Sequence, residues 1–325
     1  MADLVFLFPG QGSQKVGMGK GLCEQWPEAR AVFAEADAAL GWSLSRLCFE
    51  GPEADLTLTA NAQPAILTTS IAALRVLQKE TDLRPVAVAG HSLGEYSALV
   101  AAGALGLVDA VRVVNLRGRF MQEAVPAGVG AMAAIIGLPQ SEVEAACAEA
   151  QAAAPGELVS PANYNGGSQV VIAGHKGAVD RACAAARARG AKLAKLLAVS
   201  APFHCALMQP AADRLAAELD KIDIGAPSVP VISNVEATPY QDRARVRSLL
   251  VRQVTAPVRW EESIQTLAAQ GITEAVEVGA GAVLAGLVKR IAPGLTVRPA
   301  GDPEAIANLR AAGAPASGDK EAQNG

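Results

Sequence analysis

The sequence predicts an α/β protein with two parts: a large domain built on a mostly parallel sheet and a small ferredoxin-like domain inserted into it. Strand-like and helix-like segments alternate along most of the 325 residues, which is typical of a parallel sheet covered by helices. The rhythm changes at Pro126-Ala-Gly-Val-Gly130, and the segments that follow have the order βαββαβ, which is typical of ferredoxin-like domains. We therefore expect the large domain over 1–127 and 199–310, the insertion over 128–198, and a disordered tail over 311–325.

Short apolar runs of the large domain are expected to be buried strands, and longer periodic runs are expected to be helices. In the first half of the chain the predicted elements are the strand Leu4–Phe8, the helix Ala65–Gln78, the strand Val86–Ala89, and the helices Glu95–Ala102 and Asp109–Glu123. After the insertion they are the helix Cys205–Leu219, the strand Val229–Ser233, the helix Glu261–Gln270, the strand Ala275–Val278 and the helix Val283–Ile291.

The insertion is expected to hold four strands and two helices. In chain order these are the strand Ala131–Ile136, the helix Gln140–Ala153, the strands Glu157–Tyr164 and Gln169–Ala173, the helix Lys176–Arg189 and the strand Lys192–Ala198. From Ala311 onward the residues are small and polar and cannot form a core, so disorder is expected there.

The composition is that of a cytoplasmic enzyme. Hydrophobic residues make up 51% of the chain, but many are alanine and no apolar run is long enough to span a membrane. The start, Met1–Pro9, lacks a basic region and is interpreted as a first core strand, not a signal peptide. The five cysteines form no C-x-x-C pair, which predicts buried free thiols in a reducing compartment and no zinc site. The net charge of −4 argues against nucleic-acid binding.

The most informative stretch is Gly90-His-Ser-Leu-Gly94, which fits the G-x-S-x-G nucleophile elbow. A β-prone run precedes it and a helix-like run follows, which is the context that the motif needs. In such a turn the glycines let strand and helix pass close together, and the helix N-terminus presents the Leu93 N–H to an oxyanion. We interpret Ser92 as a nucleophile, while a plain serine at the start of a helix is the alternative.

A nucleophilic serine needs a base, and the chain has three histidines. His91 is adjacent to Ser92 and is expected to form a pocket wall or to have a structural role. His175 lies in a polar turn of the insertion and is expected to be solvated. His204 lies where the chain returns to the large domain and enters a helix, a place typical of α/β sites, so elimination favours His204 as the base. No acid between Ser92 and His204 marks a sheet-end loop, which favours a dyad oriented by a backbone carbonyl.

Arg117 lies on an apolar helix face, because its neighbours at helical spacing are Val113, Val114, Phe120 and Met121. An arginine in such a place needs an anion, since burying an unpaired charge is very costly. One interpretation is a bidentate clamp for a substrate carboxylate. The alternatives are a stem that extends to solvent and a distant structural ion pair.

The first loop, Pro9-Gly-Gln-Gly-Ser-Gln14, is too glycine-rich for packing alone and matches neither a P-loop nor a dinucleotide-binding fingerprint. A glycine-flanked Gln11 whose backbone N–H can reach a bound oxyanion suits acyl transfer.

Taken together, the motifs carry a specific resemblance. They are Pro9-Gly-Gln-Gly-Ser-Gln14, Gly90-His-Ser-Leu-Gly-Glu-Tyr-Ser-Ala98, Arg117, Asn163-x-Asn165, Pro202-Phe-His-Cys205, Ser233-Asn-Val235 and Val251-Arg-Gln-Val254. Except for its tail, the chain resembles the malonyl-CoA:acyl carrier protein transacylase family of bacterial type II fatty-acid synthesis. One departure is Gly279-Ala-Gly-Ala282, where Gly-Pro-Gly would be expected.

The resemblance implies a fold, a reaction and roles for individual residues. The fold is a hydrolase-like α/β domain with a ferredoxin-like insertion. The reaction moves malonyl from coenzyme A to the phosphopantetheine thiol of acyl carrier protein through a malonyl-serine ester, without a cofactor or metal. The implied roles are nucleophile for Ser92, base for His204, oxyanion donors for the Gln11 and Leu93 amides, histidine orientation for the Gln253 carbonyl, and substrate binding for Arg117, His91, Phe203 and Asn163.

Other functions stay open at this point. They are an acyltransferase for methylmalonyl or another acyl-CoA, an acyltransferase of a polyketide pathway, a serine thioesterase, and a scaffold without activity. Phe203 and Leu93 resemble the residues of malonyl-selective members. The chain is expected to be a monomer that meets an acidic carrier protein transiently. Two basic clusters are candidate docking surfaces, one with Lys192 and Lys195 and the other with Lys289 and Arg290, although solvated faces would have the same composition.

Overall fold

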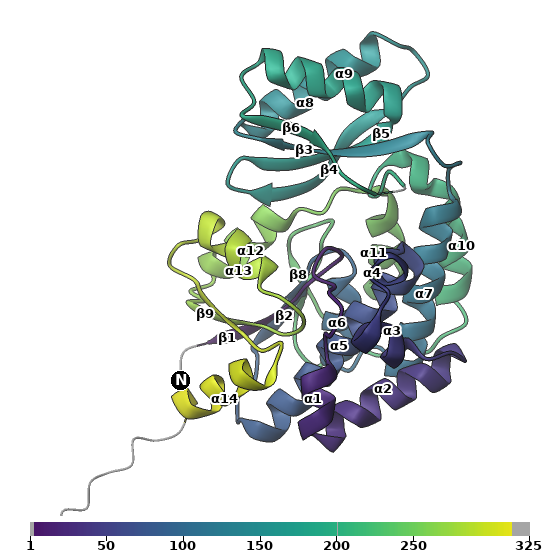
Figure 1. Ribbon diagram of the computed structural model, residues 1–325. Coiled ribbons are helices and arrows are strands. Elements are labelled where there is room, and N and C mark those ends of the chain that lie inside the picture. The colour runs from purple at the N-terminus through teal and green to yellow at the C-terminus, as the bar shows by residue number, and fades with distance from the viewer. Residues whose placement is uncertain (1–2, 200, 314–325) are drawn as a thin grey trace, which may run out of the picture.

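The computed structural model describes residues 3–199 and 201–313 and contains two separate sheets. Sheet A has the strand order β10-β9-β1-β2-β7-β8, and every pair except β7–β8 is parallel. Sheet B has the order β4-β5-β3-β6 and is antiparallel throughout. Sheet B lies at one end of the molecule, beyond the elements that surround sheet A (Figure 1). The predicted fold class is confirmed.

The strands of sheet A are short, and its central strands are fully buried. Its strands are β1 (Leu4–Phe8), β2 (Ala87–Gly90), β7 (Val231–Ile232), β8 (Pro239–Tyr240), β9 (Glu274–Glu277) and β10 (Thr296–Pro299). Alternate side chains of β1 enter different cores: Phe6 and Phe8 pack on one face of the sheet, and Val5 and Leu7 on the other. Burial on both faces explains why β1 is a continuous apolar run without polar alternation.

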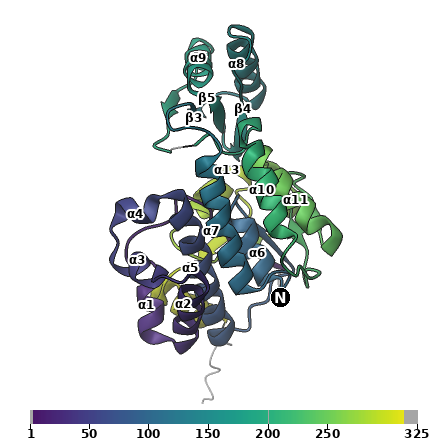
Figure 2. The ribbon, with the colours of Figure 1, turned by 90° about the vertical axis from the view of Figure 1, so that its right-hand side faces the viewer.

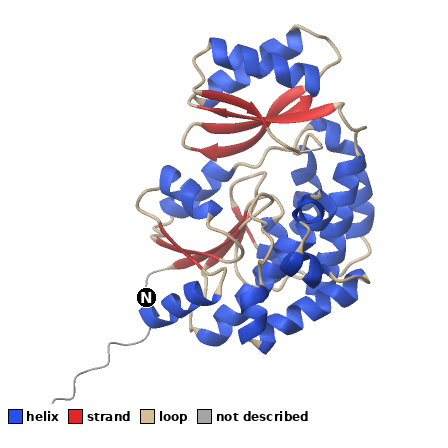
Figure 3. Cartoon of the chain, viewed as in Figure 1, coloured by secondary structure: helices blue, strands red, loops and turns tan. Residues whose placement is uncertain are grey.

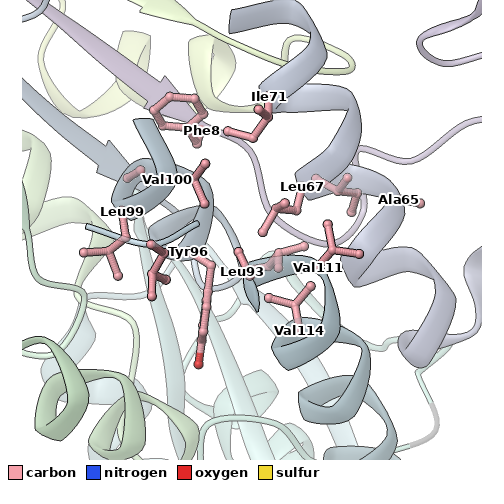
Figure 4. Close-up of a cluster of buried hydrophobic side chains, with 14 of the residues drawn as sticks. Phe8, Ala65, Leu67, Ile71, Leu93, Tyr96, Leu99, Val100, Val111 and Val114 are labelled. Carbon is pink, nitrogen blue, oxygen red and sulfur yellow. The ribbon is translucent and has the colours of Figure 1, made fainter. Parts of the chain in front are cut away.

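Helices cover both faces of sheet A (Figures 2 and 3). They are α1 (Lys20–Gln25), α2 (Pro27–Leu40), α3 (Leu44–Glu50), α4 (Glu53–Thr57), α5 (Thr59–Glu80), α6 (Gly94–Ala101), α7 (Leu107–Glu123), α10 (Gln209–Leu219), α11 (Arg243–Thr255), α12 (Trp260–Ala269), α13 (Val283–Ile291) and α14 (Pro303–Gly313). Figure 4 shows part of the core that Phe8 shares with Leu67 and Ile71 of α5, Leu99 of α6 and Val111 of α7, with Ile71 next to Phe8.

Sheet B and its helices have a hydrophobic core of their own. The elements are β3 (Gly130–Ile136), α8 (Gln140–Ala152), β4 (Val159–Gly166), β5 (Gln169–His175), α9 (Lys176–Ala188) and β6 (Leu193–Leu196). Their chain order and strand order are those of a ferredoxin-like fold. Ala133 and Ile135 of β3 face this core, whereas Met132 packs with the core of the large sheet. The second face of sheet B is therefore in contact with the large part.

Besides containing elements that received no prediction, the structure differs from the predicted elements in their bounds. The helix predicted over Cys205–Leu219 is a 3-10 turn at Ala206–Met208 followed by α10, because Pro210 fits the first turn of a helix and not its interior. The helix predicted from Ala65 begins at Thr59 and runs through a proline. Residues 311–313 belong to α14, where a disordered tail was predicted to start, and the rest of that tail lies outside the described residues.

The course of α5 through Pro64 has a local explanation. Pro64 has no N–H to donate to Ala60 one turn earlier. The side-chain amide of Asn115 on α7 donates to this free carbonyl over 2.8 Å. A contact with another helix thus replaces the missing hydrogen bond, and a reading of local sequence cannot reveal such a contact.

Candidate active site

The turn between β2 and α6 has the geometry of a nucleophile elbow. Ser92 has φ 52°, a left-handed conformation that is uncommon for a residue with a side chain. The flanking glycines allow the turn to close: a Cβ on Gly90 would lie 1.9 Å from the Gly94 carbonyl carbon, and a Cβ on Gly94 would lie 2.1 Å from the Phe8 oxygen. Strand β1, strand β2 and helix α6 therefore meet at a spacing that only glycine permits.

Asn234, which follows β7, holds the elbow from the adjacent strand. Its side-chain oxygen accepts from the Ser92 N–H over 2.6 Å, and its amide nitrogen donates to the Gly90 oxygen over 2.7 Å. Both ends of the strained turn are thus bonded to one buried side chain. Asn234 lies in the motif Ser233-Asn-Val235, which by itself indicated no role for its side chain.

Ser92 and His204 form a hydrogen-bonded dyad. Ser92 Oγ lies 2.7 Å from His204 Nε2, and His204 Nδ1 lies 2.7 Å from the main-chain oxygen of Gln253 on α11. The Gln253 carbonyl can only accept, so Nδ1 carries the proton and Nε2 is left to accept from the serine. Burial, with Arg117 nearby, lowers the pKa of His204 to about 3. The imidazole is therefore neutral at physiological pH, which is the state of a general base.

Arg117 of α7 is 2% exposed and faces the dyad. Its Nη1 donates to Gln63 Oε1 over 2.8 Å, and its Nη2 donates to Gln253 Oε1 over 2.9 Å and to Ser92 Oγ over 3.2 Å. Within 3–199 and 201–313, no carboxylate forms an ion pair with Arg117. Two neutral amides thus hold a buried cation beside the nucleophile, and the structural ion pair considered as an alternative is not found.

A cavity of about 670 Å³ lies at the dyad. Its lining comes from the first loop, α4, α5, α7, sheet B and the segment before His204, and it includes Gln11, Thr59, Gln63, His91, Ser92, Arg117, Met132, Asn163, Leu197, Phe203 and His204. The cavity therefore lies between the two parts of the molecule. Small-molecule sites often lie at the interface between two parts of a molecule.

The amides of Gln11 and Leu93 carry no hydrogen bond to another described residue. Leu93 stands at the N-cap of α6, where the helix leaves backbone N–H groups free. The side chain of Gln11 bonds to Thr59 Oγ1 over 3.3 Å, which fixes the first loop against α5. Both amides are thus available to an oxyanion formed near Ser92 Oγ.

The other predicted substrate-binding residues, His91, Phe203 and Asn163, line the same cavity. His91 Nε2 lies 2.9 Å from Asn165 Oδ1, and its ring lies 5.4 Å from the ring of Trp260. Burial lowers the pKa of His91, so its ring is neutral and forms part of the wall.

Some basic residues in or beside the two predicted clusters are held by hydrogen bonds or ion pairs within the chain. Arg187 donates to the Ala194 oxygen, and Arg189 is paired with Glu142 and Glu149. Lys192 and Lys195 on or beside β6, and Lys289 at the end of α13, are exposed. Arg290 is also exposed and donates to Gln169 Oε1 over 3.1 Å.

All five cysteines are buried and free. Within the described part of the chain there is no cluster of three or more His, Cys, Asp or Glu residues suited to a metal ion. No described helix is both long and apolar enough to cross a membrane.

Sequence reasoning missed several residues of the site. Gln63 and Glu95 are buried polar residues within helices, and Asn234 and Tyr240 belong to the edge of sheet A. A polar residue at a core position of a helix was the available signal for Gln63 and Glu95. Nothing in the local pattern indicated which partner each would meet.

The fold and the site define an α/β enzyme that uses an elbow serine and a histidine for acyl chemistry. The chain belongs to the acyl transferase domain family, whose profile matches residues 5–300. It is 52% identical over 307 residues to malonyl CoA-acyl carrier protein transacylase of Escherichia coli K12, covering 94% of this chain and 98% of that protein. The same enzyme of Bacillus subtilis 168 is 51% identical over 306 residues, with 94% and 96% covered.

Solved structures of similar proteins superimpose closely. A malonyl CoA-acyl carrier protein transacylase from Coxiella burnetii has a TM-score of 0.92 at 46% identity, with 95% of this chain and 97% of that chain covered. A malonyl-transacylase in complex with a type II PKS acyl-carrier protein also has a TM-score of 0.92 at 46% identity, with 96% and 100% covered.

Proposed function

We propose that this enzyme transfers malonyl from malonyl-CoA to the phosphopantetheine thiol of an acyl carrier protein and so supplies extender units for fatty-acid synthesis. The observation that carries the proposal is the guanidinium of Arg117, which is buried, has no ion pair within the described part of the chain, and lies 3.2 Å from Ser92 Oγ in the cavity. A free carboxylate on the acyl group would supply the counter-charge for this guanidinium. Relatives at 51–52% identity bear the name of this activity, and none of those reported above is named a thioesterase.

In the first half-reaction, Ser92 Oγ attacks the thioester carbonyl while His204 Nε2 takes the serine proton. A bond forms between Oγ and the acyl carbon. The carbon–sulfur bond then breaks, and the proton on Nε2 passes to the departing thiolate of coenzyme A. The second half-reaction runs in reverse with a new thiol: the carrier-protein thiol gives its proton to His204 and attacks the ester carbonyl. The bond between the acyl carbon and Ser92 Oγ then breaks, and the proton on His204 Nε2 returns to Oγ.

The tetrahedral intermediate places a negative charge on the former carbonyl oxygen. The amides of Gln11 and Leu93 are the proposed donors to it, since both are free of other partners. Gln253 supplies the carbonyl that keeps the proton on His204 Nδ1. This carbonyl takes the place of the acid of a triad in orienting the ring.

Arg117 is the proposed clamp for the malonyl carboxylate. Its Nη2 already spans Ser92 Oγ and Gln253, so a carboxylate can replace the serine as acceptor once the ester has formed. His91, Phe203 and Asn163 are proposed to shape the remaining wall. Neutral acyl chains leave the cation without a counter-charge and are disfavoured.

The remaining parts of the proposal concern the setting of the reaction. The enzyme works as a monomer in the cytoplasm, in keeping with its free thiols, and needs no cofactor or metal. The carrier protein docks on a basic surface near the cavity, at Lys192 and Lys195 or at Lys289 and Arg290. The division into residues 1–127 with 199–310, and an insertion at 128–198, is supported by the separate core of sheet B.

Labelling of the enzyme with malonyl-CoA tests the proposal. The wild-type chain should form a labelled ester that holo acyl carrier protein discharges, and Ser92→Ala should form none. Competition among malonyl-, methylmalonyl- and acetyl-CoA should give preferential malonyl labelling. A fully labelled Ser92→Ala variant, or rapid release of free malonate without transfer, would contradict the assignment.

A further inference from the structure

The mechanism above leaves one buried carboxylate unused. Glu95, in the first turn of α6, is 1% exposed. Its Oε2 accepts from Gln253 Nε2 over 2.7 Å and from the Asn234 N–H over 3.3 Å, and its Oε1 accepts from the Tyr240 hydroxyl over 3.1 Å. A carboxylate is costly to bury, so a buried carboxylate with three donors on the helix that follows Ser92 indicates a specific role.

The side-chain amide of Gln253 connects Glu95 to Arg117. Its oxygen accepts from Arg117 Nη2 over 2.9 Å, while its nitrogen donates to Glu95 and, over 3.0 Å, to the main-chain oxygen of Ser92. A guanidinium only donates and an ionised carboxylate only accepts. The amide therefore has one favourable orientation, because a flipped amide would face donor with donor and acceptor with acceptor.

This orientation matters for Arg117, because no carboxylate among the described residues contacts its guanidinium directly. Gln63 holds Nη1 and Gln253 holds Nη2, and these contacts fix the plane in which the guanidinium meets the cavity. The Glu95 carboxylate fixes the orientation of the Gln253 amide. Through this amide it also fixes Arg117 Nη2, the nitrogen that lies next to Ser92.

We propose that Glu95 is a positioning residue of the carboxylate clamp: through the side chain of Gln253 it aligns Arg117 and so favours acyl groups that carry a free carboxylate. This inference rests on the malonyl transfer proposed above. Acetyl has no carboxylate for Arg117 to bind, so its transfer does not depend on this alignment. Loss of Glu95 therefore changes the ratio of the two acylation rates, and not only their size.

The test measures kcat/KM for Ser92 acylation by malonyl-CoA and by acetyl-CoA on the same samples. Burial raises the pKa of Glu95 to about 7, so the assay is run at pH 8.5, where the carboxylate is ionised. Glu95→Met removes the acceptor at similar size and should lower the malonyl-to-acetyl ratio about tenfold, as expected for a lost hydrogen bond to a charged group. The ratio does not depend on the fraction of folded enzyme.

Four further variants complete the design. Glu95→Gln keeps an acceptor oxygen and should retain the ratio within about 1.5-fold. Gln253→Met removes the amide but keeps the main-chain carbonyl that orients His204, and it should lower the ratio as Glu95→Met does. In the double variant the two effects should not multiply, because both act through one contact. Tyr240→Phe removes a neighbouring bond to Glu95 and should leave the ratio unchanged.

Two results would overturn the inference. One is an equal fall for both substrates in Glu95→Met, which would give Glu95 a structural role. The other is a multiplied effect in the double variant, which would show that Glu95 does not act through Gln253. Should Glu95→Met fail to fold, Glu95→Asp, which withdraws the carboxylate by one methylene, must lower the ratio about threefold. A wild-type enzyme without malonyl preference would instead contradict the proposed function itself.

Discussion

At the scale of single residues, we propose that Arg117 selects the acyl groups that the cavity binds. Its guanidinium is buried, bonded to two neutral amides and free of any ion pair among the described residues. Such a charge is held at a cost that a matching anion would offset. The Tyr96 ring beneath it, 5.5 Å from the guanidinium carbon to the ring centroid, adds a weaker favourable contact.

The clamp can be tested by removing the charge. Arg117→Ala should lower malonyl transfer by at least ~100-fold, since breaking a buried pair costs about 3–5 kcal/mol. Acetyl transfer should be retained or should rise, because acetyl has no carboxylate to strand. Rates of Ser92 acylation by the two thioesters give the comparison, and Arg119→Ala, an exposed residue on the same helix, is the matched control. An equal loss with both substrates would make Arg117 structural.

His204 gives a prediction about pH. A histidine with the usual pKa of 6.5 would be about 90% protonated at pH 5.5 and would lose base activity about tenfold. Burial lowers the pKa of His204 to about 3, so its neutral form persists as the pH falls. The rate of Ser92 acylation at saturating acetyl-CoA, which does not depend on the Glu95 carboxylate, should therefore change less than about twofold between pH 8 and pH 5.5. A rate that titrates near pH 6.5 would refute this.

The sequence indicated Ser92, His204 and Arg117 because each had a local signal: a motif, elimination among three histidines, and an apolar helix face. Asn234 had no such signal, and the signal at Gln63, a polar residue at a core position of a helix, did not identify its partner. Gln63 lies 54 residues from Arg117, and Asn234 lies 142 residues from Ser92, so their contacts exist only in the folded chain. For the same reason, the side chain of Gln253 could not be assigned a partner, although its carbonyl was assigned through the family resemblance.

At the scale of elements, the elbow depends on the close approach of β1, β2 and α6. Alternate side chains of β1 pack into two cores, and this packing fixes the position of the strand. The glycines let α6 begin in close contact with the ends of β1 and β2. The strain at Ser92 is held by Asn234 from the neighbouring strand. The geometry of the nucleophile is therefore a property of three elements together.

A methyl group placed in this contact should disrupt it. Gly94→Ala would bring a Cβ to 2.1 Å from the Phe8 oxygen, a backbone atom that cannot easily move. We expect a loss of about 3 kcal/mol in the free energy of unfolding, measured with urea. Gly286→Ala, in helix α13, should instead gain about 0.5–1 kcal/mol, because no described atom beyond its chain neighbours and its own helix backbone lies within 4 Å of the added Cβ. Equal stabilities would contradict the packing argument.

Elements with strong patterns were predicted well, and short ones were not. The buried strands β1 and β2 and the helices α7, α8 and α9 lie within a few residues of their predicted bounds. Helices α1, α3 and α4, which have 6, 7 and 5 residues, received no prediction. Helices α2 and α11, with 14 and 13 residues, are longer and were missed as well. The strands β8 and β10 are short edge strands of sheet A, and their pairing depends on neighbours far away in the chain.

At the scale of the whole molecule, the cavity joins two separately packed parts. Gln11 and Ser92 come from the large part, while Met132 and Leu197 come from sheet B or the segment just beyond it. A carrier protein that delivers its thiol to Ser92 must therefore approach near this junction. The exposed lysines of β6 and of α13 are candidates for meeting it, because β6 leads directly into the lining segment 197–199.

Charge reversal separates the two candidate docking surfaces. Lys289→Glu with Arg290→Glu, and Lys192→Glu with Lys195→Glu, each change the net charge by the same amount. The docking pair should raise the carrier-protein KM and flatten its dependence on salt, because rim charges act mainly on the rate of association with an acidic partner. Ser92 acylation by malonyl-CoA should not change, since that half-reaction takes place without the carrier protein.

The control for this experiment is a reversal of equal charge elsewhere. Lys20 and Lys79 are exposed, and α1, which carries Lys20, lies at the end of the molecule opposite sheet B (Figure 1). Their replacement by glutamate tests the long-range effect of net charge alone. A docking role requires a larger rise in KM at Lys289 and Arg290, or at Lys192 and Lys195, than at this control. A KM equal to the control value would exclude that surface and leave its lysines as solvated charges.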